Sequence, residues 1–200
     1  MASRRPWRLT AGSDSDVGSM QRKLRVPPLA NPFHVVLVEP EIPQNTGNIS
    51  RLCAATQSAL HLVGRLGFRI DERSVRRAGL DYWHLVTLTV HSDWPSFVRH
   101  HAVGSGRVRL FSANASRSYV DAGFAPGDAL VFGKESAGLP RELLDQYPDE
   151  VYGIPTAGAV RSINLASAAA IVLYDALRCA GALAGAKLED DPSADNDFTP

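Results

Sequence analysis

Amide, hydroxyl and guanidinium side chains gather at the start of two predicted helices. Asn45, Asn48 and Arg51 recur at intervals of three, so they lie near one face of a helix predicted over residues 47–56. Ser162 and Asn164 occupy the first turn of a second predicted helix, 164–184, where backbone N–H groups have no intrahelical partner. Such groups donate hydrogen bonds to a ligand, and Arg51 adds a permanent positive charge. The simpler alternative is that Asn45 caps its helix and Arg51 is an ordinary surface residue.

Short apolar runs predict the strands that position these helices. The run 129–132 ends at Gly133, and the run 151–154 ends at Pro155, as is typical of buried parallel strands. Their loops leave the same edge of a sheet, where open α/β folds bind ligands. The alternation of strands and helices predicts an α/β fold with a largely parallel sheet flanked by helices. Further strands are expected at 34–39, 60–63, 85–90 and 108–112, and further helices at 94–101 and 141–147.

The composition limits the classes of protein that fit. Basic and acidic residues number 21 each, which excludes a globally basic nucleic-acid binder but allows a local basic patch. Cys53 and Cys179 have no metal or redox spacing, so a reducing compartment is expected, with Cys53 in the core. The histidines include no His-x-x-x-His pair, and we expect no metal. The longest apolar run, 165–173, is too short to cross a bilayer, and the N-terminus does not resemble a secretory signal. A cytoplasmic protein without membrane contact is therefore expected.

Charge is unevenly distributed along the chain. Residues 1–30 are expected to form a flexible basic tail, 31–186 the folded domain, and 187–200 a flexible acidic tail. Five arginines form the densest basic cluster, three of them on one face of a short helix that Asp71 can cap. The cluster is either a solvated face or a contact surface for RNA phosphates. Its members are Arg65, Arg69, Arg73, Arg76 and Arg77.

Common nucleotide-binding and hydrolase motifs do not fit. Gly133-Lys134 lacks the other P-loop residues, because Ala129 and Glu135 stand where a glycine and a serine or threonine are required. No Gly-x-Gly-x-x-Gly follows the first strand, and no Gly-x-Ser-x-Gly elbow is present. A P-loop, a Rossmann dinucleotide site and a serine-hydrolase elbow are therefore disfavoured.

Five ordered blocks of sequence carry a family resemblance. They are residues 38–54, 66–68 with 76–82, 132–135, 138–140 and 154–165. With these blocks the chain resembles the SPOUT superfamily of S-adenosylmethionine-dependent RNA methyltransferases over roughly residues 34–183. Within it, the chain looks most like small bacterial enzymes that methylate the ribose 2′-hydroxyl of the tRNA wobble nucleotide, cytidine or uridine 34.

The resemblance implies features that the composition does not show. It implies a C-terminal deep trefoil knot, a homodimer, and tRNA as substrate. It implies that S-adenosylmethionine is held in the knot, mainly by backbone groups of Ala113, Gly133, Ile154, Ser162 and Ile163. The implied catalytic or RNA-positioning residues are Arg51, Asn45, Glu135, Ser162, Asn164 and Tyr174.

The implied reaction needs a proton acceptor, since a ribose hydroxyl is a weak nucleophile. The resemblance points to Arg51, but a guanidinium is always protonated, so stabilising a developing alkoxide or clamping a phosphate is the expected role. Departures from close relatives at Gln57, Ser58 and Leu177 weaken the assignment of the modified nucleotide. Two alternatives stay open. One is methylation at another tRNA position or in ribosomal RNA, and the other is an RNA-binding module without activity.

Overall fold

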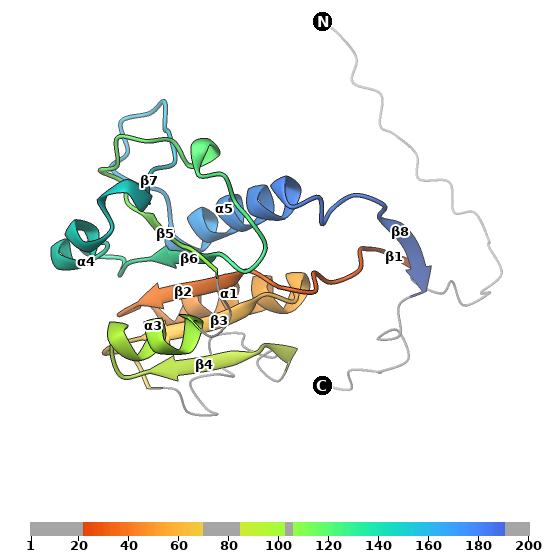
Figure 1. Ribbon diagram of the computed structural model, residues 1–200, viewed down its shortest axis with the longest axis horizontal. Coiled ribbons are helices and arrows are strands. Elements are labelled where there is room, and N and C mark those ends of the chain that lie inside the picture. Colours follow the sequence, from red (N-terminus) through yellow and green to blue (C-terminus); the bar gives the residue numbers. More distant parts are fainter. Residues whose placement is uncertain (1–21, 70–84, 103–105, 191–200) are drawn as a thin grey trace, which may run out of the picture. The chain divides into compact units, whose positions relative to one another are not determined.

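The computed structural model describes residues 22–69, 85–102 and 106–190. Within Val26–Gly185, the larger of two compact units, lies a six-stranded sheet in the order β4-β3-β2-β6-β5-β7 (Figure 1). Every neighbouring pair of these strands is parallel, which confirms the predicted α/β fold. The strands are β2 (His34–Val38), β3 (Ala59–Val63), β4 (Leu88–His91), β5 (Val108–Phe111), β6 (Ala129–Phe132) and β7 (Val151–Tyr152).

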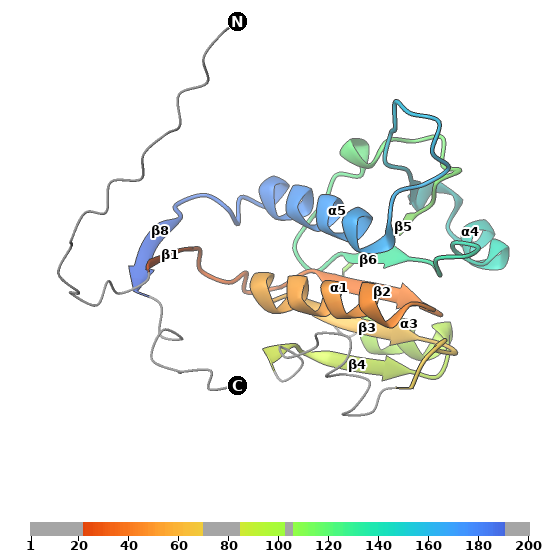
Figure 2. The same cartoon turned by 180° about the vertical axis from the view of Figure 1, so that it is seen from behind.

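Helices cover both faces of the sheet because the strands are apolar on both sides. Val35 and Leu37 of β2 face a core shared with α1 (Pro43–Thr56) and α5 (Leu165–Cys179). Val36 and Val38, which alternate with them, face a second core with α3 (Trp94–Ala102) and α4 (Arg141–Gln146). Figure 2 shows α1 and α5 side by side on the first face. Two short 3₁₀ helices, η2 (Tyr119–Asp121) and η3 (Pro148–Glu150), lie in the connections.

Several element boundaries differ from the predicted ones. Helix α1 begins at Pro43 rather than Gly47, because a proline at the first helical position has the required φ and loses no hydrogen bond. Helix α5 ends at Cys179 rather than Ala184, and Gly181 follows it with a φ of 70°. Strand β4 begins at Leu88, three residues later than expected. Cys53 is fully buried in the core, as predicted.

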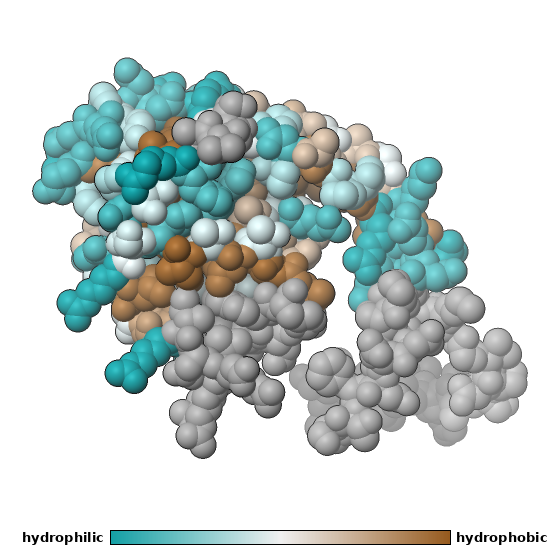
Figure 3. All heavy atoms as spheres, turned by 60° about the horizontal axis from the view of Figure 1, so that its bottom comes forward, coloured by the Kyte–Doolittle hydropathy of each residue, from teal (hydrophilic) through white to brown (hydrophobic). Residues whose placement is uncertain are grey.

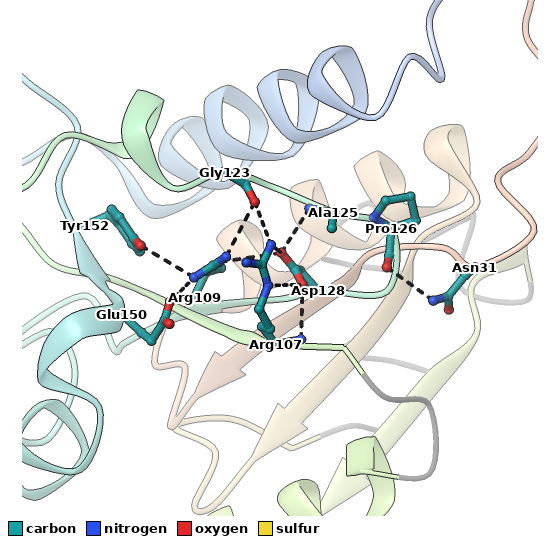
Figure 4. A network of polar contacts seen from close by, with 9 residues as sticks. All are labelled: Asn31, Arg107, Arg109, Gly123, Ala125, Pro126, Asp128, Glu150 and Tyr152. Atoms are coloured by element: carbon teal, nitrogen blue, oxygen red, sulfur yellow. Dashed lines mark hydrogen bonds and ion pairs between the residues drawn. The ribbon is translucent and has the colours of Figure 1, made fainter.

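A buried ionic network that the sequence did not reveal fixes the connection before β6 (Figure 4). Asp128, only 1% exposed, accepts hydrogen bonds from the backbone and side chain of Arg107 and from the Ala125 backbone. Its carboxylate also lies 3.5 Å from the guanidinium of Arg109, which forms an ion pair with Glu150. Because these residues are fully or partly enclosed, the network ties the segment before β6 to β5 and to the turn before β7.

Strand β4 forms one edge of the sheet, and apolar side chains in it and just before it are exposed. Leu85 is 60% exposed, and Val90 is 53% exposed. Figure 3 shows an apolar band on the side of the molecule that carries this edge. In the described residues, no helix is long and apolar enough to span a membrane.

The smaller unit contains a two-stranded ribbon. β1 (Arg22–Arg25) pairs antiparallel with β8 (Lys187–Asp190), and every residue of both strands is exposed. Arg22 and Asp190 are register partners, with an ion-pair distance of 3.5 Å. The sequence predicted no strand in either tail, because nothing in the composition of these segments indicates that they pair.

Candidate active site

Three residues expected to bind the cofactor follow three neighbouring strands. Strand β5 lies between β6 and β7, so the carboxyl ends of all three are adjacent. Ala113 comes two residues after β5, Gly133 directly after β6, and Ile154 two residues after β7. Ser162 and Ile163 lie in the loop that joins β7 to α5. Ser162 and Asn164 were predicted in the first turn of the helix, but α5 begins at Leu165 and Asn164 is its N-cap. Parallel strands therefore bring the loops of this set to one edge of the sheet.

Gly133 is required by its own loop. A Cβ atom there would lie 2.0 Å from the carbonyl carbon of Gly138 and 2.2 Å from the nitrogen of Leu139. The loop folds back because Lys134 and Gly138 form an antiparallel bridge, with the Gly138 N–H donating to the Lys134 carbonyl at 2.8 Å. The close approach at Gly133 is between two segments of backbone, which leaves no room for a Cβ atom.

A cavity of about 420 Å³ lies beside these loops. Its lining includes Ser112 and Asn114, which flank Ala113, and Leu139, which packs against Gly133. Arg141 and Asp145 of α4 also line it. Ala113 and Gly133 adjoin this lining, but none of the five expected cofactor residues is part of it. Its volume is within the range of small-molecule sites.

The Glu135 carboxylate receives three hydrogen bonds from the start of α1. The backbone N–H groups of Glu41 and Ile42 donate to it at 2.8 and 3.2 Å. The side-chain amide of Asn45 donates to it at 2.9 Å. An ionised carboxylate accepts but cannot donate, so these three donors hold the loop after β6 against the loop after β2.

The side-chain amides of Asn45 and Asn164 extend the hydrogen bonds of Glu135 to the start of α5. Because the Asn45 nitrogen faces Glu135, its oxygen faces Asn164 and accepts a hydrogen bond of 2.9 Å. The Asn164 oxygen is then free to accept from the backbone N–H groups of Ala166 and Ser167, so Asn164 caps α5. The prediction that Asn45 caps α1 is wrong, since the residue before that helix is Ile42, which has no side-chain capping bond.

A second carboxylate, which the sequence analysis missed, completes the contact between the two loops. Glu41 accepts from the backbone N–H and hydroxyl of Ser136 at 3.0 and 2.9 Å. These bonds lower the pKa of Glu41 below its ordinary value, first through the hydroxyl and then through the backbone. Beside it, Lys134 pairs with Glu39 at 3.0 Å, and Glu39 has a φ of +50°, which is unusual outside glycine. We name these reciprocal contacts of 39–42 with 134–136 the loop clasp.

The other predicted site residues lie outside the loop clasp and the hydrogen bonds of Asn45 and Asn164. Arg51 is exposed on α1, and six residues of helix place it about 9 Å farther along the axis than Asn45. Tyr174 is 47% exposed on α5, and Ser162 is exposed before that helix. Of the predicted basic cluster, Arg65 and Arg69 are exposed in the loop after β3. Arg73, Arg76 and Arg77 lie outside the described residues.

This fold, with loops at adjacent parallel strand ends, is shared with solved RNA methyltransferases. A structure described as giving structural insights into the 2-OH methylation of C/U34 on tRNA matches with a TM-score of 0.70 and 43% identity, over 74% of this chain and 96% of that one. An AdoMet-bound rRNA methyltransferase from Sinorhizobium meliloti matches with a TM-score of 0.66 and 26% identity, over 77% of this chain and 61% of that one.

The chain belongs to the SpoU rRNA methylase family, whose family profile matches residues 32–174. A relative from Burkholderia ambifaria, named tRNA (cytidine(34)-2'-O)-methyltransferase, is 44% identical over 155 residues, which are 77% of this chain and 99% of the relative. The family resemblance inferred from the sequence is confirmed.

Proposed function

We propose that this protein transfers a methyl group from S-adenosylmethionine to the ribose 2′-hydroxyl of the tRNA wobble nucleotide, cytidine or uridine 34. The observation that carries the proposal is the 44% identity to a tRNA (cytidine(34)-2'-O)-methyltransferase over nearly the whole of that relative. The placement of Ala113, Gly133 and Ile154 at three neighbouring strand ends supports it.

The loops after β5, β6 and β7 are suited to a nucleoside-containing methyl donor. Ala113, Gly133, Ile154, Ser162 and Ile163 offer mainly backbone groups, which bind a ligand without any side-chain charge. The adjacent cavity of about 420 Å³ is large enough for a ligand of that size. When bound, the donor supplies a methyl carbon on a positively charged sulfur. Transfer would join the ribose 2′-oxygen to that carbon as the carbon–sulfur bond breaks, which would leave a neutral thioether and release the hydroxyl proton to water.

The side chains around the site divide into two groups. Arg51, exposed and always charged, stabilises the developing alkoxide or clamps a neighbouring phosphate. Ser162 and Tyr174 have exposed hydroxyl groups that can position the nucleotide. Asn45, Glu135 and Asn164 are positioning residues, because their polar atoms are committed to one another and to backbone. Together they hold the starts of α1 and α5 beside the donor loops.

RNA binding is assigned to the basic cluster beside the site. Arg65 and Arg69 are exposed and follow β3, so they lie at the same edge of the sheet as the donor loops. Arg73, Arg76 and Arg77 complete the proposed cluster in sequence. Contacts with phosphates would position the tRNA without reading its sequence.

We also propose a homodimer, a deep trefoil knot and a cytoplasmic location. Membership of the SpoU family supports the knot. Gly153 donates to the Arg117 carbonyl at 2.8 Å and accepts from the Tyr119 N–H at 2.9 Å, which extends the parallel pairing of β7 with β5. The chain after β7 therefore runs against the segment after β5.

The homodimer is supported by exposed side chains on α5. Ile171 and Tyr174 are 37% and 47% exposed, which gives a second copy of the chain an apolar surface next to the site.

Isotope-labelled S-adenosylmethionine and unmodified tRNA transcripts test the proposal. Purified protein should label the ribose of nucleotide 34, and a transcript with a 2′-deoxynucleotide at that position should accept no label. Label at another tRNA position, or in ribosomal RNA alone, would establish the first alternative. Failure of the folded protein to bind S-adenosylmethionine in calorimetry would favour the RNA-binding module without activity.

A further inference from the structure

Five imidazole rings form one layer between the sheet and α3, away from the loop clasp. His34, His61 and His91 come from the neighbouring strands β2, β3 and β4. His100 and His101 come from α3, which packs on β3 and β4. We name these five residues the histidine layer. His61 is 1% exposed, His91 is 4% exposed and His101 is 4% exposed, so most of the layer is shielded from water.

Three of the rings form a hydrogen-bonded row across the sheet. His34 Nδ1 lies 2.9 Å from His61 Nε2, and His61 Nδ1 lies 3.0 Å from His91 Nε2. A neutral imidazole has one donor and one acceptor nitrogen, so the row is satisfied when all its rings are neutral and donate in the same direction. One added proton can be shared if His61 donates to both neighbours. A second proton sets two N–H groups against each other and breaks a hydrogen bond.

His101 contributes a further buried proton site, where burial opposes protonation more than the nearby backbone of Gly106 and Arg107 favours it. Both of its ring nitrogens are buried, and neither makes a hydrogen bond of good geometry within the described residues. Its ring stacks on Phe97 at 5.4 Å between centroids and meets the His34 ring edge-on at 4.9 Å. A charged His101 would therefore be buried against an aromatic ring and another imidazole.

The two carboxylates near the histidine layer are already engaged elsewhere and do not fully balance a positive charge on its rings. Asp93, at the start of α3, favours protonation of His91, but its carboxylate also caps the helix by accepting from the Ser96 N–H at 2.7 Å. Asp128 favours protonation of His101, but it is already paired with Arg107 and Arg109. The other neighbours of the rings are Phe97 of α3, which touches His61, His91 and His101, and the backbone of Gly106 and Arg107, which lies near His101 and carries no net charge.

We propose that the histidine layer is a pH-sensitive latch, which holds α3 on the sheet while the imidazoles are neutral and releases it when more than one proton enters. Release is local because the layer joins α3 to β2, β3 and β4, whereas α1 and α5 pack on the opposite face. The Gly64 N–H donates to the His91 carbonyl at 3.0 Å, so the latch also adjoins the loop that carries Arg65 and Arg69. This proposal does not depend on the reaction that the protein catalyses.

The pKa values agree in direction with this geometry. Burial, reinforced by the neighbouring imidazoles, lowers the pKa of His34 to about 4 and that of His61 to about 3, from 6.5. Burial is also the largest cause that lowers the pKa of His91 and His101. The unfolded chain therefore binds more protons than the folded one between about pH 6.5 and pH 4. Stability gained from neutral histidines is complete above this window and is lost as the pH falls through it.

Amide hydrogen exchange of the full chain, corrected for intrinsic rates, tests the latch. Between about pH 7 and pH 4.5, protection of α3 should fall by about tenfold or more while protection of α5 changes little. His101→Phe removes a proton site but keeps an aromatic ring on Phe97, so α3 should stay protected to a lower pH. Arg99→Lys is the matched control, since Arg99 is exposed on the same helix and lies outside the histidine layer, and it should leave the midpoint unchanged.

The latch is overturned if α3 and α5 of the unmodified protein lose protection at the same pH, or if α3 keeps its protection throughout. It is also overturned if a folded His101→Phe variant loses α3 protection at the unmodified protein's pH. If that variant does not fold, the comparison of α3 with α5 in the unmodified protein decides alone.

Discussion

The side-chain amides of Asn45 and Asn164 share a hydrogen bond of 2.9 Å although 119 residues separate them. Glu135 fixes the direction of this bond, because it accepts from the Asn45 nitrogen and leaves the Asn45 oxygen for Asn164. One carboxylate on the loop after β6 therefore determines how α5 is capped. The three residues connect three loops that the sequence keeps far apart.

Asn164→Asp and Asn164→Ala separate the two roles of this asparagine. Aspartate keeps an oxygen for the Ala166 and Ser167 N–H groups but cannot donate to Asn45, whereas alanine loses both contacts. Asn164→Ala should lower the free energy of unfolding by about 1 kcal/mol more than Asn164→Asp. Methyl transfer should fall in both variants. Denaturant unfolding and initial rates measure the difference, and full activity in Asn164→Asp would contradict the connection from Asn45 to α5.

Glu135→Gln should destabilise the loop clasp. The glutamine nitrogen is a donor and would face the N–H of Glu41 or the amide of Asn45, both of which are donors themselves. The expected loss in the free energy of unfolding is about 1 kcal/mol, because Glu135 is only half-buried and water can partly satisfy the displaced groups. Glu142→Gln, on the exposed surface of α4, is the matched control and should be neutral. Equal stabilities of the two variants would show that the three bonds to Glu135 contribute little.

Gly133→Ala tests the tight turn after β6. Its Cβ would lie 2.0 Å from backbone that cannot move as a side chain can, so the loop must shift. We expect a loss of about 1–3 kcal/mol, typical of overpacking, and weaker binding of S-adenosylmethionine. Gly158→Ala, in the loop between β7 and α5, has open space within 4 Å and should keep its stability. Thermal unfolding and calorimetry of the pair measure both effects, and a fully stable Gly133→Ala protein would show that the turn tolerates a side chain.

Arg51→Ala should abolish most methyl transfer while leaving binding of S-adenosylmethionine unchanged. Arg51 lies on the exposed surface of α1 and is not one of the residues assigned to the donor, so its loss should affect the reacting oxygen or a phosphate rather than donor binding. A loss of about 100-fold or more in rate is the usual size for a group that stabilises charge in the transition state. Incorporation of labelled methyl groups at a near-normal rate would contradict this role.

Much of the fold could be predicted because strands and helices have distinct apolar patterns. The runs at 34–39, 60–63, 108–112 and 129–132 match β2, β3, β5 and β6 closely, since strands buried on both faces are almost continuously apolar. The predicted element boundaries that were wrong are those set by contacts with distant parts of the chain. Asn45 has the residue type of a helix cap, but Pro43 starts α1 earlier and Glu135 recruits the Asn45 side chain.

The site was predictable only in part. The family blocks identified Asn45, Glu135 and Asn164, but no pattern in the sequence shows that they bond to one another. The loop clasp was missed because Glu41 and Ser136 are 95 residues apart and neither is an unusual residue in a loop. The histidine layer was missed for a similar reason, since β2, β3 and β4 bring together residues that have no regular spacing in the chain.

A crystal structure with S-adenosylmethionine bound tests the account most directly. It should show the donor against backbone groups of Ala113, Gly133 and Ile154, with its methyl group directed toward the side of the site that carries Arg51. A donor bound elsewhere on the molecule, with these three loops unchanged from the free protein, would contradict the account.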